Sequence, residues 1–296
     1  MKVLCFGSLN IDYVYSVQQF VRKGETISSE ALEVFAGGKG LNQSIALSKA
    51  GARVCHAGVI GTDGMFLRDL LESEGVNTDF VKVKEDVRTG NAIIQRDRNG
   101  ENCIILYSGS NYAVDQSMID EVLERFEAGD YLLVQNEINE VPQIVEKAHA
   151  KGMKVILNPS PFNEKIFQIP LEQVDCFLLN EVEAQRMLGV EREADITVER
   201  LREKYPDAEF VLTLGAKGSV YLGKYGKIEQ KAYKVKTVDT TAAGDTFTGY
   251  YLAGCMNGIP VKEALDLAAR ASAIAVSKKG ASHSIPLKEE VFHFGK

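Results

Sequence analysis

Short apolar runs alternate with amphipathic segments along most of the chain. The runs are continuous, rich in β-branched residues and bounded by Gly, Asn or charged residues, which is typical of buried strands. They read KVLCFGS, RVCHAGVIG, YLLVQ, KVILN, CFLLN and FVLTLG. Helical spacing of apolar residues predicts helices over residues 41–50, 64–74, 116–126, 142–151, 181–188, 198–204, 245–256 and 261–278, and then a short tail. This alternation predicts an α/β fold, in which helices cover both faces of a parallel sheet.

Two segments break this pattern. Residues 12–36 alternate between apolar and polar positions without a good helix, and residues 89–111 hold two strand-like runs joined across Arg98-Asn99-Gly100. Asn-Gly between alternating runs is a strong hairpin signal. We expect both segments to form one small antiparallel sheet over the end of the main sheet. The sheet could be edge decoration, but it also suits a lid that excludes water. The chain, residues 1–296, would then be a single domain with this lid.

Composition and charge narrow the functional classes. The chain has 296 residues and a net charge of −7, from 34 basic and 41 acidic residues without a long run of either sign. This length suits one large α/β domain. Nucleic-acid binding is disfavoured because it requires a basic face. A small anionic ligand stays compatible with the charge, since local backbone dipoles can hold one.

The cysteines and the N-terminus bear on the compartment. Five cysteines are widely spaced and form no CxxC pair, so we expect reduced thiols rather than disulfides or a metal site. The start MKVLCFGSLNID reaches an acidic residue too early for a signal peptide. No apolar run approaches the ~20 residues that a bilayer span needs. We expect a cytoplasmic protein that does not bind a membrane.

A single carboxylate stands out in the stretch TTAAGDTFTG, residues 240–249. Helical spacing begins at Asp245, which is therefore at or just inside a helix N-terminus, where free N–H groups favour negative charge. An ordinary N-cap would explain Asp245 but not the small residues before it. Ala242, Ala243 and Gly244 would let a large anion approach the exposed amides and so form an anion hole. An acid beside such a hole suits phosphoryl transfer, with the acid accepting a hydroxyl proton.

Two stretches carry a resemblance to a known family. DTTAAGDTFTG resembles the C-terminal signature of the ribokinase family, the PfkB-type carbohydrate kinases, and AGGKGLNQSIALSKAGA, residues 36–52, resembles its N-terminal Gly-Gly signature. The two stretches occur in the family's order, and the likeness covers essentially the whole chain. The resemblance implies an α/β/α sandwich with a small β lid, and an ATP-dependent kinase of a free sugar in which Asp245 is the base.

The sugar site is expected at the end of the first strand. GSLNIDY places Asn10 and Asp12 at the carboxyl end of a parallel strand, where ligands bind in such folds. Taken alone, Asn-x-Asp is more often a turn. The resemblance implies that the sugar is ringed by Asn10, Asp12, Gly38, Lys39, Asn42 and Glu137, with Asp245 on the phosphorylated hydroxyl. Ribose, phosphorylated at its 5-hydroxyl, is the first expectation, ahead of fructose or another ketose and then a nucleoside.

An acidic sugar would need arginines near the lid. Arg88, Arg96 and Arg98 are available, but they flank the hairpin and fit solvated edge charges better. A small neutral sugar is therefore favoured.

The nucleotide site lacks the common phosphate-binding motifs. There is no G-x-x-x-x-G-K-[ST], and no G-x-G-x-x-G follows the first strand. The resemblance implies that ATP is bound by Asn180, Thr213, Gly215, Gly218, Gly244 and Ala269. Glu183, one helical turn after Asn180, would hold Mg²⁺ through water, although a helix cap with a first-turn Glu explains this pair equally well. The resemblance also implies a K⁺ site made by Asp239, Thr241, Ala275, Lys278, Gly280 and Ser284.

Two further expectations concern partners and a rival class. We expect the small sheet to serve a second role as well, by pairing between subunits to make a homodimer. A non-catalytic sugar-binding or regulatory protein on the same fold is the alternative from another class. Asp245 and the pair Asn180 and Glu183 argue against it, since binding alone needs no general base.

Overall fold

The structure is a computed structural model, which describes residues 1–190 and 198–295. In this part of the chain the main sheet has nine strands in the order β13-β12-β11-β10-β9-β8-β1-β4-β5. The seven from β11 to β5 are parallel, and β12 and β13 extend the edge as an antiparallel hairpin. The strands are β1 Val3–Phe6, β4 Val54–Gly61, β5 Asn77–Lys84, β8 Tyr131–Gln135, β9 Lys154–Asn158, β10 Cys176–Asn180, β11 Glu209–Thr213, β12 Ser219–Gly223 and β13 Gly226–Gln230.

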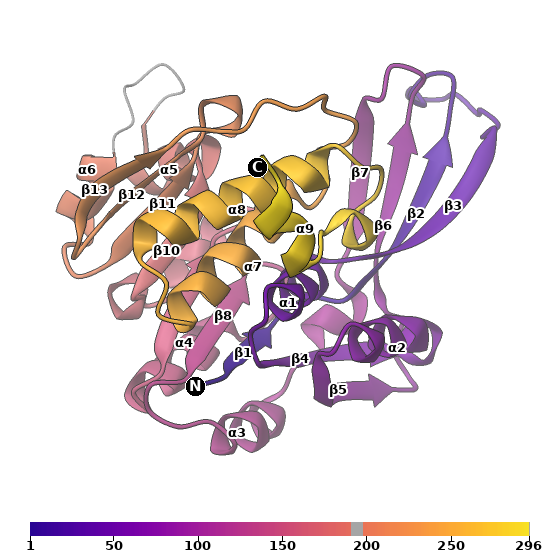
Figure 1. The fold of residues 1–296 in the computed structure, drawn as a ribbon. Coiled ribbons are helices and arrows are strands. Elements are labelled where there is room, and N and C mark those ends of the chain that lie inside the picture. The colour runs from indigo at the N-terminus through magenta and orange to yellow at the C-terminus, as the bar shows by residue number, and fades with distance from the viewer. Residues whose placement is uncertain (191–197, 296) are drawn as a thin grey trace.

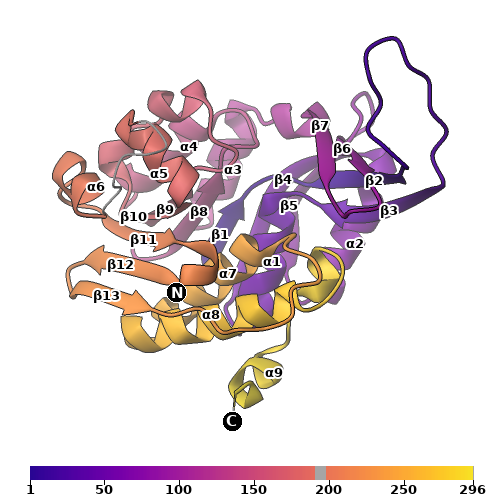
Figure 2. The same cartoon turned by 90° about the horizontal axis from the view of Figure 1, so that it is seen from above.

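Helices cover both faces of this sheet (Figure 2). One face carries α1 Lys39–Lys49, α2 Met65–Ser73, α7 Ala243–Met256 and α8 Val261–Val276. The other face carries α3 Gln116–Glu124, α4 Val141–Ala150, α5 Glu181–Leu188 and α6 Val198–Lys204. Each face has its own cluster of buried apolar residues. The predicted α/β/α sandwich is confirmed, and the eight predicted helices agree with these to within two residues at either end.

Four elements, α9, β5, β12 and β13, were not expected from the sequence. The tail contains a short helix, α9 Lys288–His293. β5 is an edge strand with alternating burial, so it lacks the continuous apolar run of a central strand. The hairpin of β12 and β13 follows the turn at Gly215 and Gly218, which was expected only to end a strand.

The two irregular segments form a second sheet at the carboxyl ends of the parallel strands (Figure 1). Its strands are β2 Asn10–Ser16, β3 Ala31–Gly37, β6 Gly90–Arg96 and β7 Asn102–Tyr107, in the order β3-β2-β6-β7. The pairs β2/β3 and β6/β7 are antiparallel hairpins, and the second is the one predicted across Asn99-Gly100. The two hairpins meet through β2 and β6, which run parallel, so the small sheet is mixed at its centre. Gly100 has the positive φ of 84° that the predicted turn requires.

The strand register divides the small sheet into two faces. Asp12, Phe35, Ala92 and Leu106 are in one cross-strand row. The adjacent row points to the opposite face, because side chains alternate along a strand. That opposite face carries a group of exposed apolar side chains, here called the outer apolar face: Leu32, Val34, Ile93, Ile105 and Tyr107.

None of the described helices is both long and apolar enough to cross a membrane.

Candidate active site

Polar residues end one parallel strand after another. β8 ends at Gln135, β9 at Asn158, β10 at Asn180 and β11 at Thr213, while β1 is followed closely by Asn10. The carboxyl ends of parallel strands share one edge of the sheet, which is where ligands bind in open α/β folds. The N-termini of α1 and α7 lie at the same edge. Both helices line a cavity there of about 230 Å³, together with Asn158, Asn180 and Thr213.

Asp245 lies in the first turn of α7, as predicted, and only 7% of it is exposed. Ala242 directly before the helix has the left-handed φ of 58°, which turns the chain into α7. The predicted hole residues Ala242, Ala243 and Gly244 all line the cavity with Asp245. The Ala243 N–H already donates to the Thr240 carbonyl at 3.2 Å. An anion in this hole would therefore be bound by the neighbouring backbone amides more than by the Ala243 N–H.

Two consecutive residues of α1 hold the Asp245 carboxylate. Asn42 Nδ2 donates to Oδ2 at 3.2 Å, and Gln43 Nε2 donates to Oδ1 at 2.9 Å. Asn42 Oδ1 is buried and has no hydrogen-bond partner within the described residues. An unsatisfied buried acceptor is costly, so Asn42 is set to accept a hydrogen bond from a ligand hydroxyl.

The remaining residues predicted for the sugar gather around the start of β2. Asn10 Oδ1 accepts from Asn111 Nδ2 at 2.7 Å. Glu137 accepts from the Lys39 backbone N–H at 3.0 Å and from the Ser8 hydroxyl. These contacts join β1, α1 and the residues after β8, so the structure brings the predicted sugar residues together beneath the small sheet.

Electrostatics couple three of these residues. Burial, reinforced by the nearby charge of Glu137, raises the pKa of Asp12 from 3.8 to about 7. Burial also raises the pKa of Glu137, against the opposing effect of Lys39. Burial alone would lower the pKa of Lys39, but the carboxylates of Asp245, Glu137 and Glu183 outweigh it and raise the pKa. Lys39 is thus a persistent ammonium group among carboxylates.

The glycines around the start of α1 make room for the protein itself. A Cβ on Gly40 would lie 2.5 Å from the Ser8 backbone nitrogen, and a Cβ on Gly37 would overlap the Asp12 carboxylate. Gly38 has a φ of 96°, which L side chains rarely adopt. Gly37 and Gly40 thus admit close packing of Asp12 and of the chain that follows β1.

A larger cavity of about 740 Å³ opens beside the first one. It is lined by Thr213, Gly215, Gly218, Gly244 and Ala269, five of the six residues predicted for the nucleotide. Apolar side chains such as those of Val235, Phe247 and Val276 complete its wall. The sixth residue, Asn180, lines the smaller cavity instead. Thr213, Gly244 and Phe247 line both cavities, so the two meet at the N-terminus of α7.

Asn180 and Glu183 form a reciprocal capping box on α5. The Asn180 side chain accepts from the Glu183 N–H at 3.0 Å, and the Glu183 carboxylate accepts from the Asn180 N–H at 3.0 Å. Both residues also line the smaller cavity with Lys39 and Asp245. The structural and the functional interpretation of the pair are therefore compatible.

Of the residues predicted for K⁺, Thr241 and Gly280 contact Asp239, whereas Ala275, Lys278 and Ser284 make their hydrogen bonds and ion pairs with other groups. Asp239 Oδ1 accepts from the Thr241 backbone N–H at 2.9 Å and hydroxyl at 2.6 Å, and its Oδ2 accepts from the Gly280 N–H at 3.1 Å. Burial opposes the charge of Asp239, but these hydrogen bonds outweigh it and lower the pKa. The Lys278 ammonium instead pairs with Glu290 at 2.8 Å, and Ser284 donates to the Ala281 carbonyl. Ala275 accepts from the Lys278 backbone N–H at 3.1 Å.

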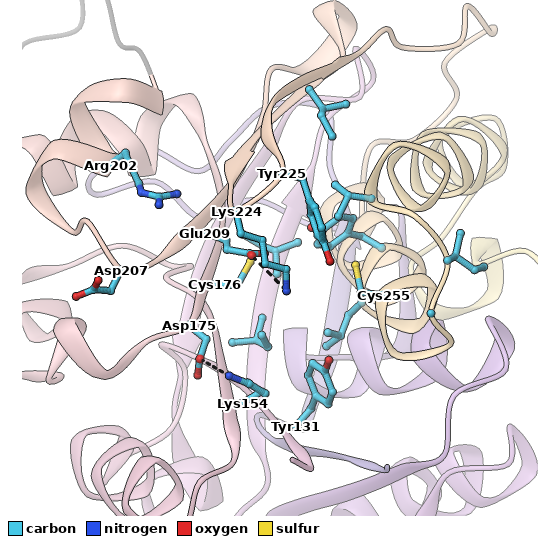
Figure 3. A pocket seen from close by; sticks show the side chains of 18 residues that line it. Tyr131, Lys154, Asp175, Cys176, Arg202, Asp207, Glu209, Lys224, Tyr225 and Cys255 are labelled. Atoms are coloured by element: carbon cyan, nitrogen blue, oxygen red, sulfur yellow. Dashed lines mark hydrogen bonds and ion pairs between the residues drawn. The ribbon is translucent and has the colours of Figure 1, made fainter. Parts of the chain in front are cut away.

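Another cavity, of about 480 Å³, lies at the opposite edge of the sheet (Figure 3). It is lined by residues at the amino ends of the strands, such as Tyr131 of β8, and contains none of the predicted site residues. Its central charges are paired, Lys154 with Asp175 at 3.1 Å and Lys224 with Glu209 at 3.8 Å (Figure 3). The predicted chemistry is thus confined to the carboxyl edge.

Several site residues were missed in the sequence. Ser8, Gln43, Asn111, Gln135 and Asn158 all hydrogen-bond to predicted site residues or to one another. The signal for two of them was present, because YLLVQ and KVILN each end a buried strand with an amide side chain. In the sequence, these amides were interpreted only as residues that mark the end of a strand.

Comparison with known proteins agrees with this geometry. The pfkB family carbohydrate kinase profile matches residues 1–288. A ribokinase of Haemophilus influenzae is 34% identical over 296 residues, covering 97% of this chain and 96% of the relative.

Solved structures lead to the same family. The ribokinase of Cryptococcus neoformans in complex with ADP has a TM-score of 0.86 and 33% identity, with 98% of each chain covered. The Arabidopsis thaliana ribokinase complexed with ribose and ATP has a TM-score of 0.86 and 28% identity, covering 98% of this chain and 97% of that one. The resemblance seen in the two signature stretches is confirmed. The chain belongs to the pfkB family of carbohydrate kinases.

Proposed function

We propose that this chain transfers the γ-phosphoryl group of ATP to the 5-hydroxyl of D-ribose, and that residues 1–296 act as one kinase unit. The observation that carries the proposal is the position of Asp245, where a polar ring beneath the small sheet meets the nucleotide cavity. The related Arabidopsis thaliana protein was solved with ribose and ATP, which supports the same pair of substrates here.

The proposed chemistry assigns one role to each group. The sugar hydroxyl loses its proton to Asp245 as its oxygen forms a bond to the γ-phosphorus, and the bond from that phosphorus to the ADP oxygen breaks. Free amides at the start of α7 and the Lys39 ammonium stabilise the charge on the transferred group. Asn42 and Asp12 orient the sugar, because each offers an acceptor to a hydroxyl.

The arginines near the lid support a neutral sugar. Arg88 pairs with Asp63 at 3.4 Å, Arg96 with Glu33 at 2.7 Å and Arg98 with Glu30 at 2.6 Å. These pairs are at the surface, as expected for solvated edge charges. A carboxylated sugar would need a cation there that these pairs do not supply.

Mg²⁺ fits as an ion that arrives with the nucleotide. No group of three His, Cys, Asp or Glu residues able to cage a metal occurs among the described residues. Mg²⁺ keeps several waters and often binds through one or two carboxylates and substrate phosphates, which suits Glu183 in the smaller cavity. When bound, it would neutralise charge on the phosphates.

K⁺ would be held by the loop around Asp239. The carboxylate draws Thr241 and the chain at Gly280 together, next to the start of α7. Oxygen donors of this kind suit a hard cation. Activity that is indifferent to replacing K⁺ with Na⁺ or a bulky organic cation would rule out this role.

The outer apolar face supports a homodimer. Side chains of Leu32, Val34, Ile93, Ile105 and Tyr107 are exposed together on one side of the small sheet. Contiguous apolar surface of this kind typically marks an interface. The cytoplasm, where ATP is abundant and thiols are reduced, is the compartment that fits the five free cysteines.

A coupled assay of ADP release tests the substrate. Ribose, fructose, adenosine and 2-keto-3-deoxygluconate would be compared at equal concentration, and ribose is expected to give the highest kcat/KM. Asp245→Asn is expected to retain binding of sugar and nucleotide but to lower kcat by ~10² or more. Near-normal turnover in that variant would contradict the role of Asp245, and a preference for another sugar would contradict ribose.

A further inference from the structure

A chain of buried amides ends on the Asp245 carboxylate. Gln135 Nε2 donates to Gln43 Oε1 at 2.7 Å. Gln43 Nε2 in turn donates to Asp245 Oδ1 at 2.9 Å and to Asn158 Oδ1 at 3.0 Å. The four side chains come from the end of β8, from α1, from the end of β9 and from α7.

The direction of the Gln43 amide is fixed by its partners. Asn158 Nδ2 donates to the Leu178 carbonyl at 2.8 Å, which leaves Asn158 Oδ1 as the acceptor that faces Gln43. Gln135 occupies the oxygen of Gln43, so the two N–H groups of Gln43 must face Asn158 and Asp245. Rotating the amide by 180° would place its oxygen against two acceptors and its nitrogen against a donor.

Burial makes this arrangement hard to break. Gln43 is 0% exposed and Gln135 is also buried. Water cannot replace a lost partner at a fully buried amide, so an unmade hydrogen bond carries its full desolvation cost. A buried glutamine is less favourable than an apolar side chain unless its hydrogen bonds are needed, which suggests a role beyond packing.

The two side chains that hold Asp245 differ in whether they also face the sugar site. Asn42, on Oδ2, has a free acceptor for a ligand hydroxyl and belongs to the proposed sugar ring. Gln43, on Oδ1, has both amide ends occupied by protein. Gln43 therefore holds the carboxylate through an amide that is engaged by protein at both ends, whereas Asn42 keeps an oxygen free for the sugar.

We propose that Gln43 is a positioning residue that holds Asp245 so that Oδ2 is presented to the reacting hydroxyl, with Gln135 and Asn158 holding Gln43. The role in turnover rests on the proposed function. The role in placing the carboxylate does not, because every contact is present in the protein alone.

Kinetics of paired variants provide the first test. Gln43→Glu keeps the size but removes the N–H donor, and Gln43→Met removes all hydrogen bonding. Both are expected to lower kcat ~10-fold or more, with KM for sugar and ATP changed less than ~3-fold, because misplacing a catalytic group affects the transition state more than the ground state. Gln135→Met, which frees Gln43 to rotate, is expected to lower kcat by a smaller factor.

Ser44→Ala is the matched control. Ser44 is the next residue of α1 and equally buried, but it bonds to His56 Nδ1 at 2.8 Å rather than to Asp245. It is expected to keep kcat within ~3-fold, since surrounding helix geometry is retained. If the Gln43 variants fold and keep kcat within the range of Ser44→Ala, or change KM and kcat together, the positioning role is wrong.

Crystal structures separate this proposal from the proposed function. In Gln43→Met the Asp245 carboxylate is expected to rotate about χ2 relative to wild type, and in Ser44→Ala it is expected to stay in place. An unrotated carboxylate in Gln43→Met would overturn the proposal even if ribose is phosphorylated. Conversely, a wild-type protein that phosphorylates none of the tested sugars would overturn the function and leave this structural test intact. Should Gln43→Glu fail to fold, Gln43→Met alone decides.

Discussion

The Asp12 carboxylate lies directly over the backbone of Gly37, so that a Cβ added at residue 37 would overlap the carboxylate carbon and both oxygens. The two residues belong to neighbouring strands of the small sheet, β2 and β3. Glycine at this position is therefore required by the Asp12 side chain, which reaches it diagonally from the neighbouring strand, rather than by a turn. The absence of a side chain at residue 37 leaves the space beneath the small sheet that the Asp12 carboxylate occupies.

Gly37→Ala is expected to displace Asp12 and to weaken sugar binding. Hydrogen bonds to charged groups contribute about 1.5–3 kcal/mol, so KM for the sugar should rise ~10-fold or more, with KM for ATP little changed. Initial rates measured against each substrate check this. In an Asp12→Ala background the same change should have little further effect, because its target has been removed. A full additional loss in the double variant would contradict the mechanism.

Sugar affinity is expected to depend on pH through Asp12. Its pKa of about 7 means that the acceptor form grows as pH rises towards and past neutrality. The kcat/KM for the sugar should rise with pH below about 7 and level off above it. Asp12→Asn should lose this limb of the profile while other limbs remain. A profile that is unchanged in Asp12→Asn would show that another group titrates.

Stability should show the opposite slope. Because the folded pKa of Asp12 is raised, the native state retains a proton between pH 3.8 and about 7 that the unfolded chain has lost. The Asp12 contribution therefore favours folding at the acid end of this window and declines as pH approaches 7. Urea unfolding across the window should show a flatter or rising profile in Asp12→Asn. Parallel profiles for the two proteins would contradict the raised pKa.

Ala242 offers a test of the turn that builds the hole. Its φ of 58° is left-handed, which suits Gly, is tolerated by Ala and is poor for a β-branched residue. Ala242→Gly should change the free energy of unfolding by less than ~1 kcal/mol and keep kcat within a few-fold. Ala242→Val should destabilise by about 1–3 kcal/mol and lower kcat. Chemical denaturation and initial rates of both variants check this, and equal effects of Gly and Val would contradict the backbone explanation.

Local sequence patterns predicted most of the fold. The spacing of apolar residues placed eight helices, because burial of one helix face is a local property that recurs every turn. β5 was not predicted, because an edge strand is buried on one side only and shows no continuous apolar run. The parallel pairing of β2 with β6 was not predicted either, since no local sequence pattern determines how two hairpins pair with each other.

The candidate site was predictable only in part. Asn10, Asp12 and Asp245 could be placed at a strand end or a helix start, and the two signature stretches supplied the rest. Gln43 could not be found in this way, since its partners Gln135 and Asp245 are 92 and 202 residues away. A side chain whose role depends on such distant contacts leaves no periodic trace in the sequence.

The outer apolar face leads to a prediction about assembly. Ile105 is 61% exposed on β7, at the free edge of the small sheet, in a row with Ile93 and Val34. If two copies pair through this face, Ile105→Lys should convert a dimer to a monomer in sedimentation or light scattering, because burying an unpaired ammonium is strongly unfavourable. Val83→Lys, an exposed apolar position on β5, should leave the mass unchanged. A wild-type monomer would contradict the dimer. A dimer that survives Ile105→Lys would place its interface elsewhere.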